Sequence, residues 1–112
     1  MADEHFLAQL WATIESRKAN GAPEGSYTRK LLADPRLIRR KIIEEAYELN
    51  EAHQALQHAR DTKDHVAHEA ADLVYHLLVL LASVDVTPSE VYTVLARRHA
   101  SPGSGTPPAG NP

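Results

Sequence analysis

The chain has 112 residues, of which 43% are hydrophobic, so it is long enough for one compact domain and too short for two. Its net charge of −3 and its pI near 6.1 provide no basic field for nucleic acid, because the twelve Lys and Arg residues are interspersed with acids and His. The absence of cysteine excludes disulfides, thiolate metal sites and a Cys nucleophile.

The N-terminal segment and the apolar runs predict a cytoplasmic protein with no membrane partner. Residues Met1 to His5 lack the basic residues and the long apolar stretch of a signal peptide. The longest apolar run, about Leu73 to Val84, contains Tyr75 and His76 and is shorter than the roughly 20 residues that span a bilayer.

The first predicted element is a helix from about Asp3 to Lys18. Its apolar residues recur with the 3.6-residue period of an amphipathic helix; they are Phe6, Leu7, Leu10, Trp11 and Ile14. Trp11 lies on this apolar face, so we expect it to anchor the core. A break that contains Asn, Gly and Pro follows at residues 20–25 and ends the helix.

Two further helices are predicted after this break. A short helical turn covers about 28–33, with Ser26 or Thr28 as its N-cap. A long helix then runs from Pro35 to about Ala59, because Asp34 can cap it and proline suits the first helical position. Its apolar residues keep helical spacing, and no Gly or further Pro interrupts it.

We place the domain at residues 1–100, and the rest of its sequence predicts two more helices. After a turn at residues 60–63, a third long helix runs from about Asp64 to Val84. A last helix begins at the capping box Thr87-Pro88-Ser89-Glu90 and extends to about His99. Residues 101–112 have no apolar period and consist of Ser, Pro, Gly, Ala, Thr and Asn, so we expect a disordered tail.

No segment alternates with period two, so the fold class is all-α, a helical bundle of four to five helices. The second half of the helix at about 64–84 is apolar on nearly every side and must be buried on every side. The few helices of one small chain surround such a helix poorly. We therefore expect a homodimer whose paired helices complete the bundle.

Two clusters of carboxylates at helical spacing are the strongest functional signal. Glu44-Glu45-x-x-Glu48 and Glu69-x-x-Asp72 each place their acids on one helix face. Two bare charges about 5 Å apart repel by roughly 3 kcal/mol at an effective dielectric near 20, so a bound divalent cation is the simplest relief. Solvated helix faces are the alternative, but the second cluster adjoins an apolar run, where acids are usually paired or bound to metal.

An all-oxygen ligand set favours Mg²⁺, or Mn²⁺, over Zn²⁺. Mg²⁺ completes its shell with waters and substrate phosphates, which indicates phosphate-ester or anhydride chemistry. Glu44 and Glu45 are then the candidate catalytic carboxylates, with Glu44 accepting the proton of water. A di-iron or di-manganese carboxylate bundle would need Glu-x-x-His, which occurs nowhere in the chain.

The residues around the acids form a longer pattern, which is Ser26-Tyr27-Thr28-x-x-Leu31, Lys41-Ile42-x-Glu44-Glu45-Ala46-x-Glu48, Glu69-x-Ala71-Asp72-Leu73-x-Tyr75-His76-Leu77-x-Val79-Leu80, Val91 and Arg97. Over about Leu7 to Arg98 this pattern resembles a known family, the phosphoribosyl-ATP pyrophosphohydrolases of histidine biosynthesis. The wider MazG-like all-α nucleoside triphosphate pyrophosphohydrolases share the acid pattern alone.

This resemblance implies Mg²⁺-dependent hydrolysis of phosphoribosyl-ATP to phosphoribosyl-AMP and pyrophosphate, an early step of L-histidine biosynthesis. By position it implies four metal ligands, which are Glu45, Glu48, Glu69 and Asp72. It also implies that Ser26, Tyr27 and Thr28 are substrate-loop positions. The chain lacks the length and the cysteines of a fused cyclohydrolase domain, so it would be the monofunctional form.

Basic and aromatic residues supply further candidates for substrate contacts. Guanidinium and ammonium groups form the charge-assisted bonds that phosphates need; the best placed are Arg29, Lys30, Lys41, Arg97 and Arg98. Lys41 could equally form a one-turn salt bridge to Glu44 or Glu45. Tyr75 and His76 either touch substrate or pack in the core. The candidate substrate-binding set is Ser26, Tyr27, Thr28, Lys30, Lys41, His76 and Arg97.

Three alternatives stay open on sequence alone. The pair His65 and His68 is interpreted as a surface pair rather than a zinc site, because it lies beside a turn. A housekeeping pyrophosphohydrolase of the MazG-like type would apply the same chemistry to other nucleoside triphosphates. A non-catalytic helical dimer would instead bind partners through its acidic faces.

Overall fold

The computed structural model describes residues 5–21 and 25–100, and every regular element in these ranges is a helix. The all-α class predicted from the sequence is therefore confirmed. The predicted residues Asp3 and Glu4 of the first helix and the predicted tail at 101–112 lie outside the described residues. The helices are α1 (Phe6–Asn20), α2 (Tyr27–Leu32), α3 (Pro35–Gln57), α4 (Lys63–Ser83) and α5 (Pro88–His99).

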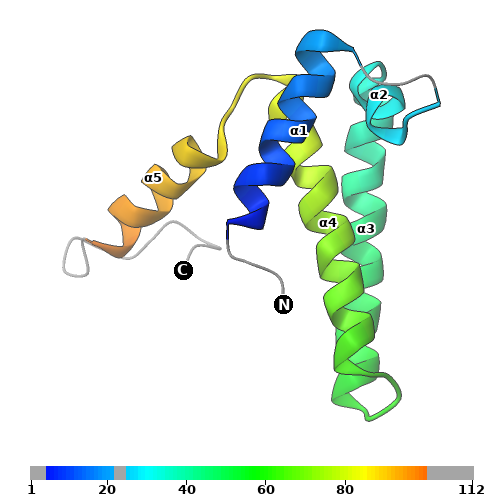
Figure 1. Cartoon of the computed structure of the whole chain (residues 1–112). Helices are drawn as coiled ribbons and strands as arrows, with labels where there is room; N and C mark the ends of the chain where they lie inside the picture. The colour runs from blue at the N-terminus through cyan, green and yellow to red at the C-terminus, as the bar shows by residue number, and fades with distance from the viewer. Residues whose placement is uncertain (1–4, 22–24, 101–112) are drawn as a thin grey trace.

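Helices α3 and α4 form a long antiparallel hairpin that is the main body of the molecule (Figure 1). The short helix α2 packs at the end of this hairpin where α3 begins and α4 ends, and α1 lies against the same end of α4. Helix α5 projects away from the hairpin after the turn that follows α4. Four helices therefore form one body, and α5 stands apart from it within the single chain.

Local side-chain caps explain where four of the helices begin. Ser26 Oγ accepts a hydrogen bond from the Arg29 backbone N–H at 3.3 Å, which decides between the two predicted caps of α2. Asp34 caps α3 directly before Pro35, as predicted. The predicted capping box is present in both directions at the start of α5. The N-cap residues are Ser26, Asp34, Thr62 and Thr87.

The hydrophobic core lies where α1, α2, α3 and α4 meet. Each of the first three helices contributes one residue to the buried cluster, and α4 contributes three. Trp11 packs against this cluster while remaining partly buried, in agreement with its predicted role as a core anchor. The buried cluster consists of Ile14, Leu31, Ile38, Leu78, Val79 and Ala82.

A lysine ties the end of α1 to the end of α4. Lys18 Nζ donates a hydrogen bond to the Ala82 carbonyl at 2.7 Å and forms an ion pair with Asp85 Oδ1 at 2.6 Å. Asp85 has a φ of +59°, the left-handed conformation that often follows the end of a helix. The lysine thus donates to a carbonyl at the end of α4 that would otherwise bond to water, and it links α1 to that end of α4.

The prediction that α4 is buried on every side is not met within one chain. Val74 is 38% exposed and Leu77 is 42% exposed on this helix. By length and composition α4 would also suffice to cross a membrane, a property that core helices of soluble bundles share. The packing of α4 against α1, α2 and α3 agrees with a core helix whose remaining apolar surface lacks a cover.

Candidate active site

The two acid clusters meet where α3 and α4 run side by side. Carboxylate oxygens of Glu45 and Glu48 on α3 and of Glu69 on α4 all lie within 4.8 Å of one another. The Glu45 side chain is only 8% exposed and that of Glu69 is 16% exposed, whereas Glu48 lies at the surface. The structure thus brings together three of the four expected metal ligands in a group that opens to solvent on one side.

The charge of this group is only partly compensated. Carboxylates at such distances repel by roughly 3 kcal/mol per pair at an effective dielectric near 20. Lys41 Nζ lies 3.3 Å from Glu45 Oε1, but Oε2 of Glu45 and Oε2 of Glu69 are buried without a hydrogen-bond partner. Because buried carboxylate oxygens are normally paired or bound to metal, these oxygens fit a hard divalent cation such as Mg²⁺ or Mn²⁺.

The other two predicted carboxylates lie outside this group. Asp72 is exposed one turn beyond Glu69, and the group within 4.8 Å does not include its side chain. Glu44 faces the cations of its own helix, with Arg40 Nε at 3.5 Å and Lys41 Nζ at 3.2 Å. The hydrogen bonds to Glu44 and then Glu45 raise the pKa of Lys41, so this ammonium stays charged between them.

A cluster of four side chains from α2 and α4 adjoins the acids. His76 is buried, and its Nδ1 bonds to the Asp72 carbonyl at 2.7 Å. Since that nitrogen donates to a carbonyl, Nε2 is the nitrogen that contacts the Tyr27 hydroxyl, at 2.7 Å. The Thr28 hydroxyl bonds to the Tyr75 hydroxyl, and the Tyr27 and Tyr75 rings stack with centroids 6.2 Å apart. Three of the predicted substrate residues are therefore linked to one another.

Tyr27 connects this cluster to solvent and to the acids. Its side chain is 44% exposed, so one part of the ring remains free for contact. Burial of its hydroxyl raises the pKa of Tyr27, an effect that nearby Lys41 opposes and that nearby Glu45 and Glu44 reinforce. Tyr27 therefore remains a protonated hydrogen-bond donor at neutral pH, close to the carboxylates.

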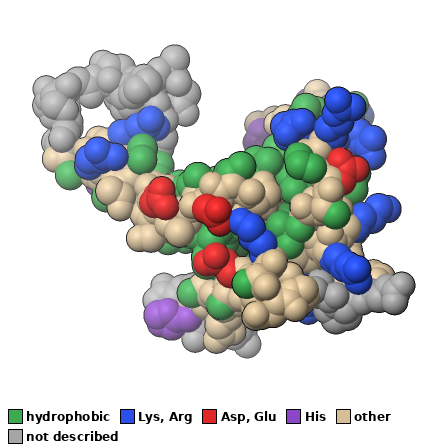
Figure 2. Space-filling view, turned by 90° about the horizontal axis from the view of Figure 1, so that it is seen from above, with side chains coloured by type: hydrophobic (Ala, Val, Ile, Leu, Met, Phe, Trp, Pro, Cys, Tyr) green, Lys and Arg blue, Asp and Glu red, His purple; other side chains and the backbone are tan. Residues whose placement is uncertain are grey.

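The fold also gathers basic side chains that are interspersed along the sequence. Viewed from the end where α2 packs, Lys and Arg side chains gather along one side of the molecule, and others lie near the middle of the view and on the opposite, projecting part (Figure 2). Half of the chain's twelve Lys and Arg residues belong to α2 and to the first part of α3. Arg97 and Arg98 lie instead on α5, apart from the α3–α4 hairpin. The α2 and α3 residues are Arg29, Lys30, Arg36, Arg39, Arg40 and Lys41.

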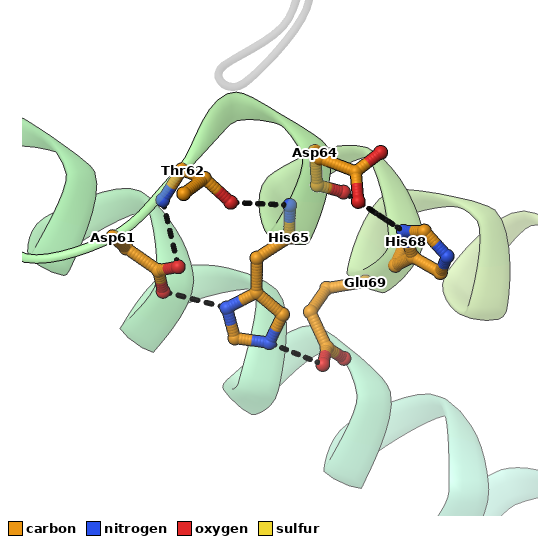
Figure 3. Close-up of polar contacts among 6 residues, drawn as sticks. All are labelled: Asp61, Thr62, Asp64, His65, His68 and Glu69. Atoms are coloured by element: carbon orange, nitrogen blue, oxygen red, sulfur yellow. Dashed lines mark hydrogen bonds and ion pairs between the residues drawn. The ribbon is translucent and has the colours of Figure 1, made fainter.

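His65, which the sequence analysis interprets as a surface residue, contacts the acidic group directly. Its Nε2 lies 3.1 Å from Glu69 Oε1, and its Nδ1 lies 2.6 Å from Asp61 Oδ2 (Figure 3). His68 has a separate partner, Asp64, at 3.5 Å. His65 and Glu69 are four residues apart on α4 and therefore share a helix face, whereas Asp61 precedes the N-cap Thr62 and reaches the ring from the turn before the helix.

A family model matches almost the whole described chain. The phosphoribosyl-ATP pyrophosphohydrolase model matches residues 7–99, which include both acid clusters and the aromatic residues described above. The chain belongs to this family. The matched range agrees with the resemblance from about Leu7 to Arg98, and family membership confirms the hydrolase class predicted from the sequence.

Individual relatives agree with the family match. A phosphoribosyl-ATP pyrophosphatase of Caulobacter sp. strain K31 is 46% identical over 97 residues, which cover 87% of this chain and 85% of that protein. A phosphoribosyl-ATP pyrophosphatase of Cereibacter sphaeroides is 43% identical over 98 residues, covering 87% and 89%. The histidine biosynthesis bifunctional protein his7 of Schizosaccharomyces pombe is 41% identical over 93 residues, covering 83% of this chain and 20% of that protein.

Proposed function

We propose that this chain hydrolyses phosphoribosyl-ATP to phosphoribosyl-AMP and pyrophosphate, an early step of L-histidine biosynthesis, in the cytoplasm and with Mg²⁺ or Mn²⁺. Glu45, Glu48 and Glu69 hold the cation in this proposal, with Asp72 as the fourth ligand. The observation that carries it is the pair of buried, unpartnered oxygens on Glu45 and Glu69 within a member of this family. Charged oxygens that are buried away from water are normally stabilised by a counter-charge or a bound metal ion.

The cation, when bound, supplies neutralisation of phosphate charge and activation of water. The chain's own residues bind and orient the substrate. Lys41 lies within 3.3 Å of both Glu44 and Glu45, so a phosphate drawn to the acidic group meets this ammonium there. Once Lys41 turns to the phosphate, Glu44 keeps Arg40 as its partner, and its exposed carboxylate then accepts the proton of water.

The remaining proposed substrate contacts come from α2 and its surroundings. Tyr27 offers an exposed ring and a hydroxyl beside the acids, while His76 and Thr28 hold that ring and its neighbour Tyr75 in place. Ser26 caps the helix, and Lys30, which follows Arg29 on α2, adds positive charge there. Arg97 lies on α5, apart from this group, so its proposed contact with substrate requires a second chain.

Release of pyrophosphate tests the proposal directly. We expect fast release from phosphoribosyl-ATP with Mg²⁺, little release from a panel of ordinary and deoxynucleoside triphosphates, and none from any substrate in EDTA. Release from other triphosphates alone would assign the chain to the housekeeping type. If no substrate releases pyrophosphate although the protein is folded, the acidic faces belong to a non-catalytic dimer.

We also propose that the chain forms a homodimer through the uncovered apolar face of the hairpin. Ile43 and Tyr47 on α3 are 71% and 63% exposed, and Leu77 on α4 is 42% exposed. Burial of such side chains is worth about 25 cal/mol per Å² of apolar area, so a partner that covers them is strongly favoured. Light scattering should give about twice the 12.4 kDa of one chain, and Ile43→Asp should shift the mass toward one chain. A wild-type mass of one chain at micromolar concentration would contradict the dimer.

A further inference from the structure

The two oxygens of the Glu69 carboxylate have different surroundings. Oε1 lies 3.1 Å from Nε2 of His65, whereas Oε2 is buried and has no hydrogen-bond partner. Glu45, which belongs to the same group and whose side chain is 8% exposed, also has a buried and unpartnered Oε2. One oxygen of Glu69 is therefore bonded to a residue outside the acidic group, and the other is buried without a partner.

The ring of His65 donates through both of its nitrogens. Nδ1 lies 2.6 Å from Asp61 Oδ2, and Nε2 faces Glu69 Oε1. Ionised carboxylates only accept hydrogen bonds, so an N–H of the ring donates in each contact. His65 thus bridges the two carboxylates through its two nitrogens.

Hydrogen bonds at the start of α4 hold Asp61 and His65 in place. Thr62 Oγ1 accepts a hydrogen bond from the His65 backbone N–H at 3.1 Å, and Asp61 Oδ1 accepts from the Thr62 backbone N–H at 2.8 Å (Figure 3). Asp61 therefore contacts both the cap residue and the ring. The cap at the start of α4 fixes the backbone of His65, so the His65 ring has little freedom to turn away from Glu69.

We propose that His65 is a positioning residue for the cation site: it holds Oε1 of Glu69 so that Oε2 points into the acidic group, and Asp61 holds the ring. This inference rests on the proposed function, because it assigns a role to His65 only if Glu69 binds a cation. Neighbours that orient a metal ligand change metal affinity by about 10- to 100-fold when they are removed. If His65 only stabilised the start of α4, its removal would change the free energy of unfolding and leave cation affinity unaltered.

Substitutions at His65 test the contacts of its two ring nitrogens separately. His65→Gln keeps an N–H near the position of Nε2 and so retains the contact to Glu69, whereas His65→Asn keeps an N–H near Nδ1 and retains only the contact to Asp61. His65→Ala removes both contacts. His68→Ala is the matched control, because His68 pairs with Asp64 one turn away and is also exposed.

Cation affinity is measured by calorimetry and by the EPR signal of free Mn²⁺, on full-length folded variants checked by circular dichroism. We expect His65→Ala and His65→Asn to raise the Mn²⁺ dissociation constant about tenfold, and His65→Gln and His68→Ala to leave it within about twofold. The Mg²⁺ concentration for half-maximal pyrophosphate release should rise in parallel, with kcat at saturating Mg²⁺ nearly unchanged.

The outcomes distinguish this inference from the proposed function. If wild type binds Mn²⁺ and releases pyrophosphate but His65→Ala and His65→Asn have wild-type affinity, the role of His65 is wrong and the proposed function stands. If His68→Ala weakens binding as much as His65→Ala, the effect is general surface charge and the inference is also wrong. If wild type binds no divalent cation, the proposed function fails, and the inference fails with it.

Discussion

Replacement of Glu45 by Gln should reduce pyrophosphate release from phosphoribosyl-ATP by about a thousandfold. Metal-assisted charge stabilisation is worth several kcal/mol in the transition state, and about 4 kcal/mol corresponds to three powers of ten in rate. Gln keeps the shape of the side chain and removes the charge that faces Glu48 and Glu69. The measurement is kcat/KM with saturating Mg²⁺.

The same substitution should stabilise the protein when no cation is present. It removes one of three like charges, and Lys41 retains Glu44 as a partner. We expect the free energy of unfolding in EDTA to rise by about 1 kcal/mol, since the relieved repulsion exceeds the lost ion pair. Glu15→Gln, at an exposed position of α1, is the control and should change neither activity nor stability. Full activity in Glu45→Gln would contradict the proposed metal site.

Replacement of Leu31 by Ala should destabilise the protein by about 3 kcal/mol. Leucine-to-alanine changes at fully buried positions cost about 2–5 kcal/mol, because they leave a cavity as well as losing burial. Leu31 is 0% exposed in the core where α2 meets its neighbours. Such a loss is a large share of the roughly 5–15 kcal/mol that stabilises a small domain. Urea unfolding measures it.

Leu31→Ala should also weaken substrate binding. Helix α2 has only six residues and cannot be stable alone, so its position depends on this buried side chain. When α2 loosens, Tyr27 and Thr28 lose their fixed contacts to His76 and Tyr75, and KM for phosphoribosyl-ATP should rise more than kcat falls. Leu95→Ala on α5, where the side chain is 42% exposed, should change stability by no more than about 0.5 kcal/mol. Equal losses in both variants would contradict the role of α2.

The helices were predictable because their signals are local. Asp34 followed by Pro35, and Thr87 with Glu90 three residues later, determine helix starts through hydrogen bonds between near neighbours in the chain. The helical spacing of Glu45 and Glu48 likewise places both acids on one face whatever surrounds them. Family membership of the chain agrees with these motifs.

The parts that the sequence did not predict depend on packing and side-chain reach. Spacing puts Glu69 and Asp72 on the same side of α4, but Asp is shorter by one methylene, and its carboxylate does not join the group within 4.8 Å. His65 contacts Asp61 only because the cap at Thr62 bends the chain back toward the ring.

The hairpin of α3 and α4 also bears on the order in which the protein folds. Glu45, Glu48 and Glu69 belong to consecutive helices joined by a short turn, so closing this loop costs little chain entropy. Contacts between such neighbours form early in helical proteins, before α1 or α5 must dock. We therefore expect the three negative charges to come together at an early stage of folding, when dissolved cations have their freest access to them.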